Sequence, residues 1–139
     1  PRSTLFPYTT LFRSSKKILI VDDEPYMRIL MEQALEDFAE KGVTIFTAEN
    51  GVKALEVIKK EKPDLIFLDV MMPEMDGYDV CSKVKKDDDL KYIYIILLTA
   101  RGQEIDKKTG MECGANDYIT KPFDPDVIIG TVSEVLNIE

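Results

Sequence analysis

The chain has 139 residues, of which 45% are hydrophobic and 32% are charged, a composition typical of one soluble globular domain with a substantial core. Its formal net charge of −8 argues against nucleic acid or an anionic membrane surface as a direct ligand. No apolar run approaches transmembrane length, and the absence of histidine excludes a histidine base, a histidine metal ligand and histidine autophosphorylation within this chain.

The first segment, Pro1 to Ser14, differs from everything after it. It has no acid, little periodicity and several aromatic residues, and it lacks the long apolar core of a signal peptide. TLFPYTTLFRS, Thr4 to Ser14, resembles the translation of a common short-read sequencing adapter. We therefore interpret residues 1–14 as a non-native tail, with a natural flexible arm as the alternative, and residues 15–139 as the domain. Without the two arginines of the tail, the domain carries a formal charge of −10.

The first half of the domain alternates between predicted strands and helices. Lys17 to Val21 is a short apolar run, and Pro25 then opens a helix whose apolar residues recur at helical spacing as far as Phe38. Gly42 ends that helix, and Val43 to Ala48 is rich in strand-forming residues. Asn50 is expected to cap a second helix.

The same alternation continues through the second half. The run LIFL ends at Leu68 and is the third predicted strand, and Asp76 is expected to cap a third helix, Gly77 to Lys86. The remaining predicted elements are a strand at Tyr92–Thr99, a weakly patterned helix at Gly102–Cys113, a strand at Asp117–Thr120 and a last helix opened by Asp124 and Pro125. Continuous apolar strands indicate burial on both faces. The sequence therefore predicts an α/β fold: a five-stranded parallel sheet, doubly wound as (βα)5, in a flavodoxin-like three-layer sandwich.

Polar residues stand at the carboxyl ends of four of the predicted strands. Asp22 and Asp23 follow the first, Asp69 the third, Thr99 ends the fourth and Lys121 follows the fifth. In such a sheet, ligands bind beyond the carboxyl ends of the strands, near the point where the strand order reverses. We therefore expect these side chains to converge on one small site.

Three carboxylates at one sheet edge favour a cation. Two carboxylates about 4 Å apart repel by roughly 4 kcal/mol at an effective dielectric of 20, and would raise each other's pKa unless neutralised. Oxygen ligands without histidine or a thiol pair suit Mg²⁺, with Mn²⁺ as a second choice. A lysine and a hydroxyl nearby suit a phosphoryl group on Asp69 acting as a carboxylate nucleophile. Taken singly, each acid has a simpler interpretation as a loop acid, and Asp23 as a cap of the first helix.

The segments ILIVDDEP, LIFLDVMMPEMDG, LLTA and DYITKPF together resemble the receiver domain of two-component response regulators. The resemblance covers about Lys16 to Ile138. It implies that Asp69 is the phospho-acceptor, that Asp22 and Asp23 hold Mg²⁺, and that the backbone carbonyl of Met71 is a further metal ligand.

The resemblance also assigns a switch. It implies that Thr99 is the switch hydroxyl, that Lys121 pairs with phosphoryl oxygens, and that the ring of Tyr118 couples the site to an output surface. That surface would be formed by the predicted helix Gly102–Cys113, the strand Asp117–Thr120 and the last helix.

The expected function is that of a cytoplasmic signalling switch rather than a metabolic enzyme. A partner histidine kinase or phosphotransfer protein would donate the phosphoryl group to Asp69 in a Mg²⁺-dependent reaction, and a downstream protein would recognise the altered surface. One alternative is a Mg²⁺-dependent phosphohydrolase with an aspartyl nucleophile, as in the haloacid dehalogenase family, although Met71 stands where such enzymes carry a second Asp. Another is a degenerate receiver used for docking alone. A free-standing regulator, part of a longer regulator and part of a hybrid kinase all remain open.

The two cysteines, Cys81 and Cys113, form no close pair or metal motif in the sequence. We expect them to be reduced core or surface thiols in a reducing cytosol.

Overall fold

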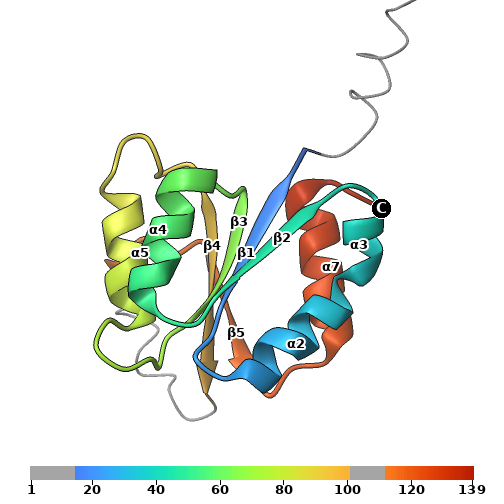
Figure 1. The fold of residues 1–139 in the computed structure, drawn as a ribbon, viewed down its shortest axis with the longest axis horizontal. Helices are drawn as coiled ribbons and strands as arrows, with labels where there is room; N and C mark the ends of the chain where they lie inside the picture. The colour runs from blue at the N-terminus through green and yellow to red at the C-terminus, as the bar shows by residue number, and fades with distance from the viewer. Residues whose placement is uncertain (1–14, 101–111) are drawn as a thin grey trace, which may run out of the picture.

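The strands of the protein form one parallel sheet. The structure is a computed structural model that describes residues 15–100 and 112–139. The strand order is β2-β1-β3-β4-β5, and every neighbouring pair is parallel (Figure 1). The strands are β1 (Lys17–Val21), β2 (Thr44–Ala48), β3 (Leu65–Asp69), β4 (Tyr94–Ala100) and β5 (Asp117–Lys121). The predicted fold class is therefore confirmed.

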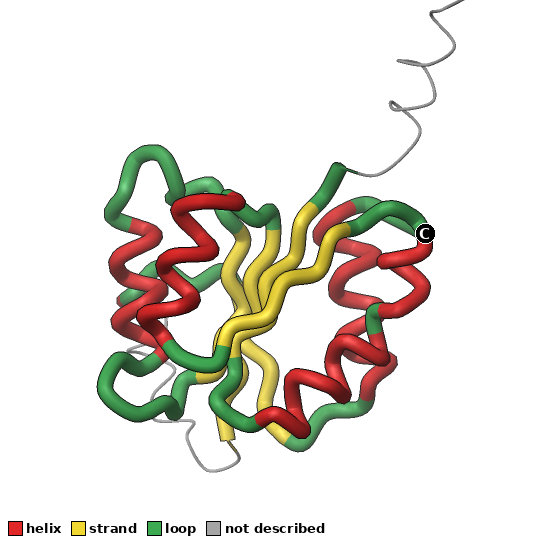
Figure 2. Tube along the Cα trace, in the orientation of Figure 1, coloured by secondary structure: helices red, strands yellow, loops and turns green. Residues whose placement is uncertain are grey.

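Helices cover both faces of the sheet. Figure 2 shows two groups of helices with the strands between them. One group contains α4 (Gly51–Glu61) and α5 (Gly77–Lys85), and the other contains α2 (Pro25–Ala34), α3 (Glu36–Glu40) and α7 (Pro125–Leu136). Of the predicted helix Gly102–Cys113, all but the last two residues lie outside the described residues.

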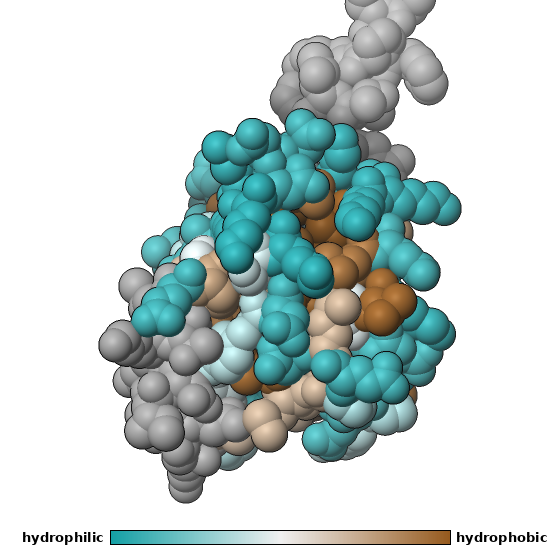
Figure 3. All heavy atoms as spheres, turned by 90° about the vertical axis from the view of Figure 1, so that its left-hand side faces the viewer, coloured by the Kyte–Doolittle hydropathy of each residue, from teal (hydrophilic) through white to brown (hydrophobic). Residues whose placement is uncertain are grey.

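Successive strand residues belong to two separate cores. Leu19 and Ile66 pack with α4 and α5, whereas Ile18 and Phe67 pack with α2, α3 and α7. This alternation explains why the strands are continuous apolar runs. On the side of the molecule where α4 and α5 lie, hydrophilic side chains cover most of the surface around a narrower hydrophobic strip (Figure 3).

Both predicted helix caps, Asn50 and Asp76, are present, and Asp124, predicted to open the last helix, is a cap as well. The Asn50 side chain accepts a hydrogen bond from the Lys53 backbone N–H, and Asp76 and Asp124 cap α5 and α7 in the same way. These caps fix where each helix begins after the preceding strand.

The first predicted helix is two helices in the structure. It breaks at Leu35, whose φ is −99° and whose N–H is shared between the carbonyls of Met31 (3.1 Å) and Glu32 (3.2 Å). Leu35, at the break, and Phe38, in α3, are both buried. The burial of these two side chains therefore divides the segment into two helices, although its apolar residues recur at helical spacing throughout.

The helices of residues 15–100 and 112–139 are all too short or too polar to cross a bilayer.

Candidate functional site

Three of the predicted site residues meet at the carboxyl ends of β1, β3 and β5. Asp22 follows β1, Asp69 is the last residue of β3 and Lys121 is the last residue of β5. The Lys121 Nζ lies 2.8 Å from Asp22 Oδ2 and 3.3 Å from Asp69 Oδ1. This edge lies beside the reversal of strand order between β1 and β3, as expected for a ligand site in such a sheet.

Backbone groups hold the two buried carboxylates in place. Asp22 Oδ1 accepts the Glu24 N–H at 3.0 Å, and Asp69 Oδ1 accepts the Met71 N–H at 3.3 Å. Asp22 is fully buried and Asp69 is 4% exposed. The Arg28 guanidinium also donates to the backbone carbonyl of Asp22 at 2.7 Å, a contact that the sequence did not reveal.

A cluster of three carboxylates forms the outer part of the site. The side chains of Asp22, Asp23 and Glu24 each place an oxygen within 4.8 Å of the others, and only Asp22 is buried. The N-cap of α2 is Glu24, with no side-chain cap, so Asp23 is not the helix cap that its simpler interpretation required. Glu24 was not among the predicted site residues, although the run of three acids was the signal that could have identified it.

Burial and charge oppose each other at Asp69. Burial first, and the charge of Asp22 second, raise the pKa of Asp69 from 3.8 to about 6, while Lys121 acts in the opposite direction. For Lys121, burial lowers the pKa, but the hydrogen bond to Asp22 and the charges of both aspartates outweigh it, so the net shift is upward. The single positive charge of Lys121 thus offsets the negative charge of the two buried carboxylates only in part.

Thr99, Tyr118 and Met71 are the other predicted site residues, and the Met71 N–H donates to Asp69 Oδ1. Thr99 follows Leu98, the residue paired with Asp69, and is half-buried. Tyr118 is a half-buried residue of β5 that packs against the core beside α5. The Met71 side chain is 62% exposed. The roles expected for these three residues stay predictions.

The loop after Asp69 is fixed by close backbone packing. A Cβ at Gly77 would lie 2.4 Å from the Asp69 carbonyl oxygen, and the Gly77 N–H donates to the Val70 carbonyl at 3.0 Å. A Cβ at Gly51 would lie 2.9 Å from Met75 atoms. Two glycines therefore allow α4 and α5 to approach this loop.

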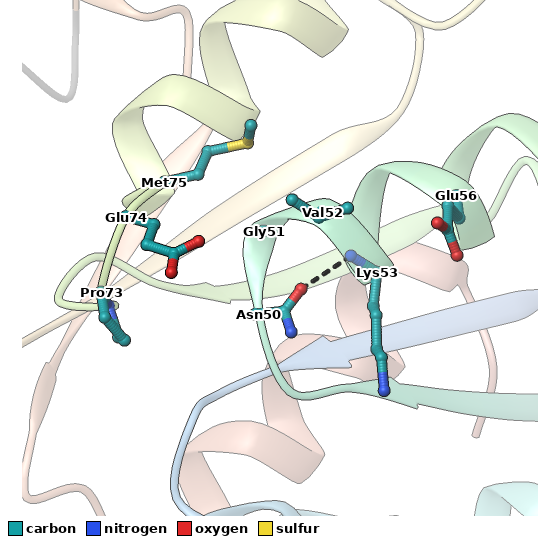
Figure 4. Close-up of a pocket in the computed structure, with 8 residues that line it drawn as sticks. All are labelled: Asn50, Gly51, Val52, Lys53, Glu56, Pro73, Glu74 and Met75. Atoms are coloured by element: carbon teal, nitrogen blue, oxygen red, sulfur yellow. Dashed lines mark hydrogen bonds between the residues drawn. The ribbon is translucent and has the colours of Figure 1, made fainter.

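A cavity of about 410 Å³ lies between that loop and the start of α4 (Figure 4). It is lined by Asn50, Gly51, Val52, Lys53, Glu56, Pro73, Glu74 and Met75, and Asn50 is engaged in capping α4. None of these eight residues belongs to the predicted site. The cavity is therefore separate from the predicted site at the strand ends.

The donor set fits a hard divalent cation. Each donor is a carboxylate oxygen, and Lys121 offsets only part of the negative charge of the buried Asp22 and Asp69. Asp22, Asp23 and Asp69 are the residues that could hold such an ion, and Glu24 lies close enough to add a ligand.

Comparison with known proteins shows the family to which the chain belongs. The family model described as "Response regulator receiver domain" matches residues 18–133. The chain is 46% identical over 121 residues to the protein named "Probable transcriptional regulator ycf27" of Pyropia yezoensis, covering 87% of this chain and 47% of that protein. It is 43% identical over 123 residues to the alkaline phosphatase synthesis transcriptional regulatory protein PhoP of Bacillus subtilis, covering 88% and 49%. The chain thus spans just under half the length of these relatives.

Solved structures are similar along nearly the whole domain. The signal receiver domain of a signal transduction histidine kinase from Syntrophus aciditrophicus has a TM-score of 0.79 and 39% identity, over 88% of this chain and 91% of that one. The chemotaxis protein CheY4 of Vibrio cholerae has a TM-score of 0.78 and 31% identity, over 88% and 99%. The chain therefore belongs to the response regulator receiver domain family.

Proposed function

We propose that Asp69 is the phospho-acceptor of a two-component signalling switch. The observation that carries the proposal is the placement of one lysine ammonium between two buried carboxylates, of which Asp69 is the one at the end of the central strand β3. A phosphoryl group on Asp69 would add a charge of about −1.5 to −2 beside the Lys121 ammonium.

The transfer is a nucleophilic substitution at phosphorus. An ionised Asp69 carboxylate oxygen forms the new O–P bond, and the bond between phosphorus and the donor atom breaks with its electron pair leaving on the donor. Lys121 is 3.3 Å from Asp69 Oδ1 and can pair with the phosphoryl oxygens. Lys121 opposes the rise in the pKa of Asp69, which reaches about 6, so the carboxylate is mostly ionised at neutral pH.

We propose that Asp22, Asp23 and Asp69, with the backbone carbonyl of Met71, hold Mg²⁺. When bound, Mg²⁺ would neutralise carboxylate repulsion and the charge that develops during transfer. The cluster of Asp22, Asp23 and Glu24 supports this assignment and adds Glu24 as a candidate ligand, direct or through water.

The donor is proposed to be a partner histidine kinase or phosphotransfer protein. These 139 residues contain no histidine, so a histidine donor would lie outside them. The relatives named as transcriptional regulators are about twice as long as the matched region. We therefore propose that this domain controls a transcriptional output carried elsewhere in a longer protein, and that it acts in the cytoplasm.

The switch is proposed to run through Thr99 and Tyr118. Thr99 is one residue beyond the partner of Asp69 in β4, and Tyr118 lies on the neighbouring strand β5. Movement of the Thr99 hydroxyl towards a phosphoryl group would let the Tyr118 ring turn inward. A downstream protein would then meet a changed surface at β5, α7 and the predicted helix Gly102–Cys113.

The proposal is tested by incubating the protein with acetyl phosphate and following its intact mass. Wild type should gain one phosphoryl group only when Mg²⁺ is present. Asp23→Ala should lower both Mg²⁺ affinity and the rate of transfer by at least about tenfold, a loss of about 1.4 kcal/mol. Glu134→Ala, which removes an exposed acid of α7, is the matched control and should behave as wild type. Equal rates for Asp23→Ala and Glu134→Ala would reject the metal assignment.

A further inference from the structure

Cys81 and Cys113 are 32 residues apart in the sequence but in contact in the structure. The Cys81 thiol donates a hydrogen bond to the backbone carbonyl of Cys113, with 3.5 Å between Sγ and O, and the two thiols are near enough for each to shift the pKa of the other. Both are thiols rather than halves of a disulfide. Both are therefore reduced, as the sequence led us to expect, but their contact did not follow from the sequence.

The chain segments that carry the two thiols are packed closely together. Cys81 is fully buried on α5, and Cys113 packs against the same hydrophobic cluster. One turn later on α5, Lys85 lies so near Gly114 that a Cβ there would be 3.0 Å from Lys85 Cγ. The two segments are therefore already in contact around both cysteines.

The two thiols differ in a way that suits stepwise oxidation. The hydrogen bond from Cys81 is the main cause that lowers the pKa of Cys113 to about 7, against the opposing effects of burial and of Asp76. That same bond, followed by burial, raises the pKa of Cys81, although Lys85 acts in the opposite direction. Cys113 is also the more exposed of the two. The accessible thiol is therefore the more readily ionised one, and thiolates are the reactive form of cysteine.

We propose that Cys81 and Cys113 form a reversible disulfide that ties α5 to the segment preceding β5. A Cys113 thiolate attacks one oxygen of a hydroperoxide, the O–O bond breaks, and Cys113 becomes a sulfenic acid while the hydroperoxide leaves as an alcohol or water. Cys81 then loses its proton and attacks the Cys113 sulfur, which forms the S–S bond and releases water. Two thiols are oxidised by two electrons and one hydroperoxide is reduced.

The disulfide would act on the strand that bears the site lysine. Three residues after Cys113, Asn116 fixes the chain by accepting the Ile95 N–H at 2.8 Å and donating its own N–H to the Ile95 carbonyl at 2.9 Å. The next residues form β5, with Tyr118 and Lys121. The regulatory part of the inference rests on the proposed function: oxidation should restrain the response of Tyr118 while leaving Asp69 able to accept phosphate.

The first experiment needs no phosphorylation. The reduced full chain is treated with hydrogen peroxide, alkylated and analysed by mass spectrometry. Wild type should lose the mass of two hydrogen atoms, give a linked Cys81–Cys113 peptide and recover with dithiothreitol. Cys113→Ser should react with peroxide at least about tenfold more slowly, because the ionised thiol is gone. Cys81→Ser should stop at a sulfenic acid that a dimedone probe captures.

Melting curves establish whether each variant is folded. If the core variant Cys81→Ser does not fold, the proposal is tested with Cys113→Ser alone. Dimers linked between chains, oxidation of Cys113 without linkage to Cys81, or linkage only in denaturant would each overturn the proposal.

The second experiment measures the coupling. NMR shifts of Tyr118 on addition of beryllofluoride are compared for the reduced and the disulfide forms. The oxidised form should show a shift change at least about twofold smaller, and equal changes would overturn the regulatory role. Failure of reduced wild type to respond at all would count against the proposed function of Asp69 and leave the peroxide result standing, so the two failures are distinguishable.

Discussion

Asp69 is a carboxylate with only 4% of its surface exposed, and the proposed function requires it in its charged form. Its pKa in the folded protein is raised from 3.8 to about 6 by burial and by Asp22. The folded state therefore binds more protons than the unfolded state between about pH 4 and pH 6, so the contribution of Asp69 to stability is greatest below this window and is lost as the pH rises through it.

We predict that Asp69→Asn removes this pH dependence. The amide cannot ionise. Without divalent cations, the free energy of unfolding of the variant relative to wild type should therefore rise by on the order of 2 kcal/mol between pH 4 and pH 7. Urea unfolding at several pH values in a chelating buffer measures the difference. Mg²⁺ at pH 7 should then stabilise wild type but not the variant. A difference between the two proteins that stays constant with pH would contradict the burial of an ionisable Asp69.

Gly77 is the second residue on which the site depends. Because a Cβ at this position would lie 2.4 Å from the Asp69 carbonyl oxygen and 2.9 Å from Val70 Cα, both backbone atoms, Gly77→Ala must displace the loop. We predict a loss of about 1–3 kcal/mol in the free energy of unfolding, together with slower phosphorylation. Gly130→Ala is the matched control, since a Cβ there meets nothing within 4 Å in α7, and it should stabilise by about 0.5–1 kcal/mol. If both alanine variants were equally stable, the close approach at Gly77 would be refuted.

At the scale of elements, helix α5 begins with a reciprocal cap directly after the Asp69 loop. Asp76 Oδ1 accepts the Asp79 N–H at 2.9 Å, and Asp79 Oδ2 accepts the Asp76 N–H at 3.2 Å. We predict that Asp76→Ala costs about 1 kcal/mol, whereas Asp76→Ser, which keeps an acceptor oxygen, retains most of that stability. Thermal unfolding of the two variants tests this. An alanine variant as stable as the serine variant would show that the cap contributes nothing.

Helices and strands could be predicted from the sequence where the residues that determine them are close together in the chain. The apolar run at Lys17–Val21 and the caps at Asn50, Asp76 and Asp124 appear as the sequence indicates. The break at Leu35 was not predictable, because it depends on how that residue and Phe38 are buried against the sheet. The contact of Cys81 with Cys113 was also invisible, because it arises from the packing of α5 on a segment 32 residues away.

At the scale of the whole molecule, parallel topology explains why the site could be predicted. The ends of β1, β3 and β5 share one sheet edge, so residues from Asp22 to Lys121, 99 positions apart, meet there. The contact of Arg28 with the Asp22 carbonyl did not follow from the sequence, because it depends on side-chain packing. Glu24 was signalled by the run of three acids but was not predicted.

The proposed domain boundary gives a test at the same scale. We propose that residues 1–14 are foreign to the domain, so their deletion should change the free energy of unfolding by less than about 0.5 kcal/mol and leave phosphorylation unchanged. Chemical denaturation of the full chain and of residues 15–139 makes the comparison. A loss of more than about 1 kcal/mol on deletion would show that the segment packs on the domain.

The most direct test of the central claim is the position of the phosphoryl group in the chain. After phosphorylation with acetyl phosphate and Mg²⁺, borohydride reduces an aspartyl phosphate to homoserine, which peptide mass spectrometry can locate. The label should appear at position 69 and should be absent from Asp69→Asn, while Asp22 and Asp23 remain unlabelled in both proteins. Labelling of Asp22 or Asp23 in wild type, or equal labelling of Asp69→Asn, would contradict the assignment of Asp69 as the phospho-acceptor.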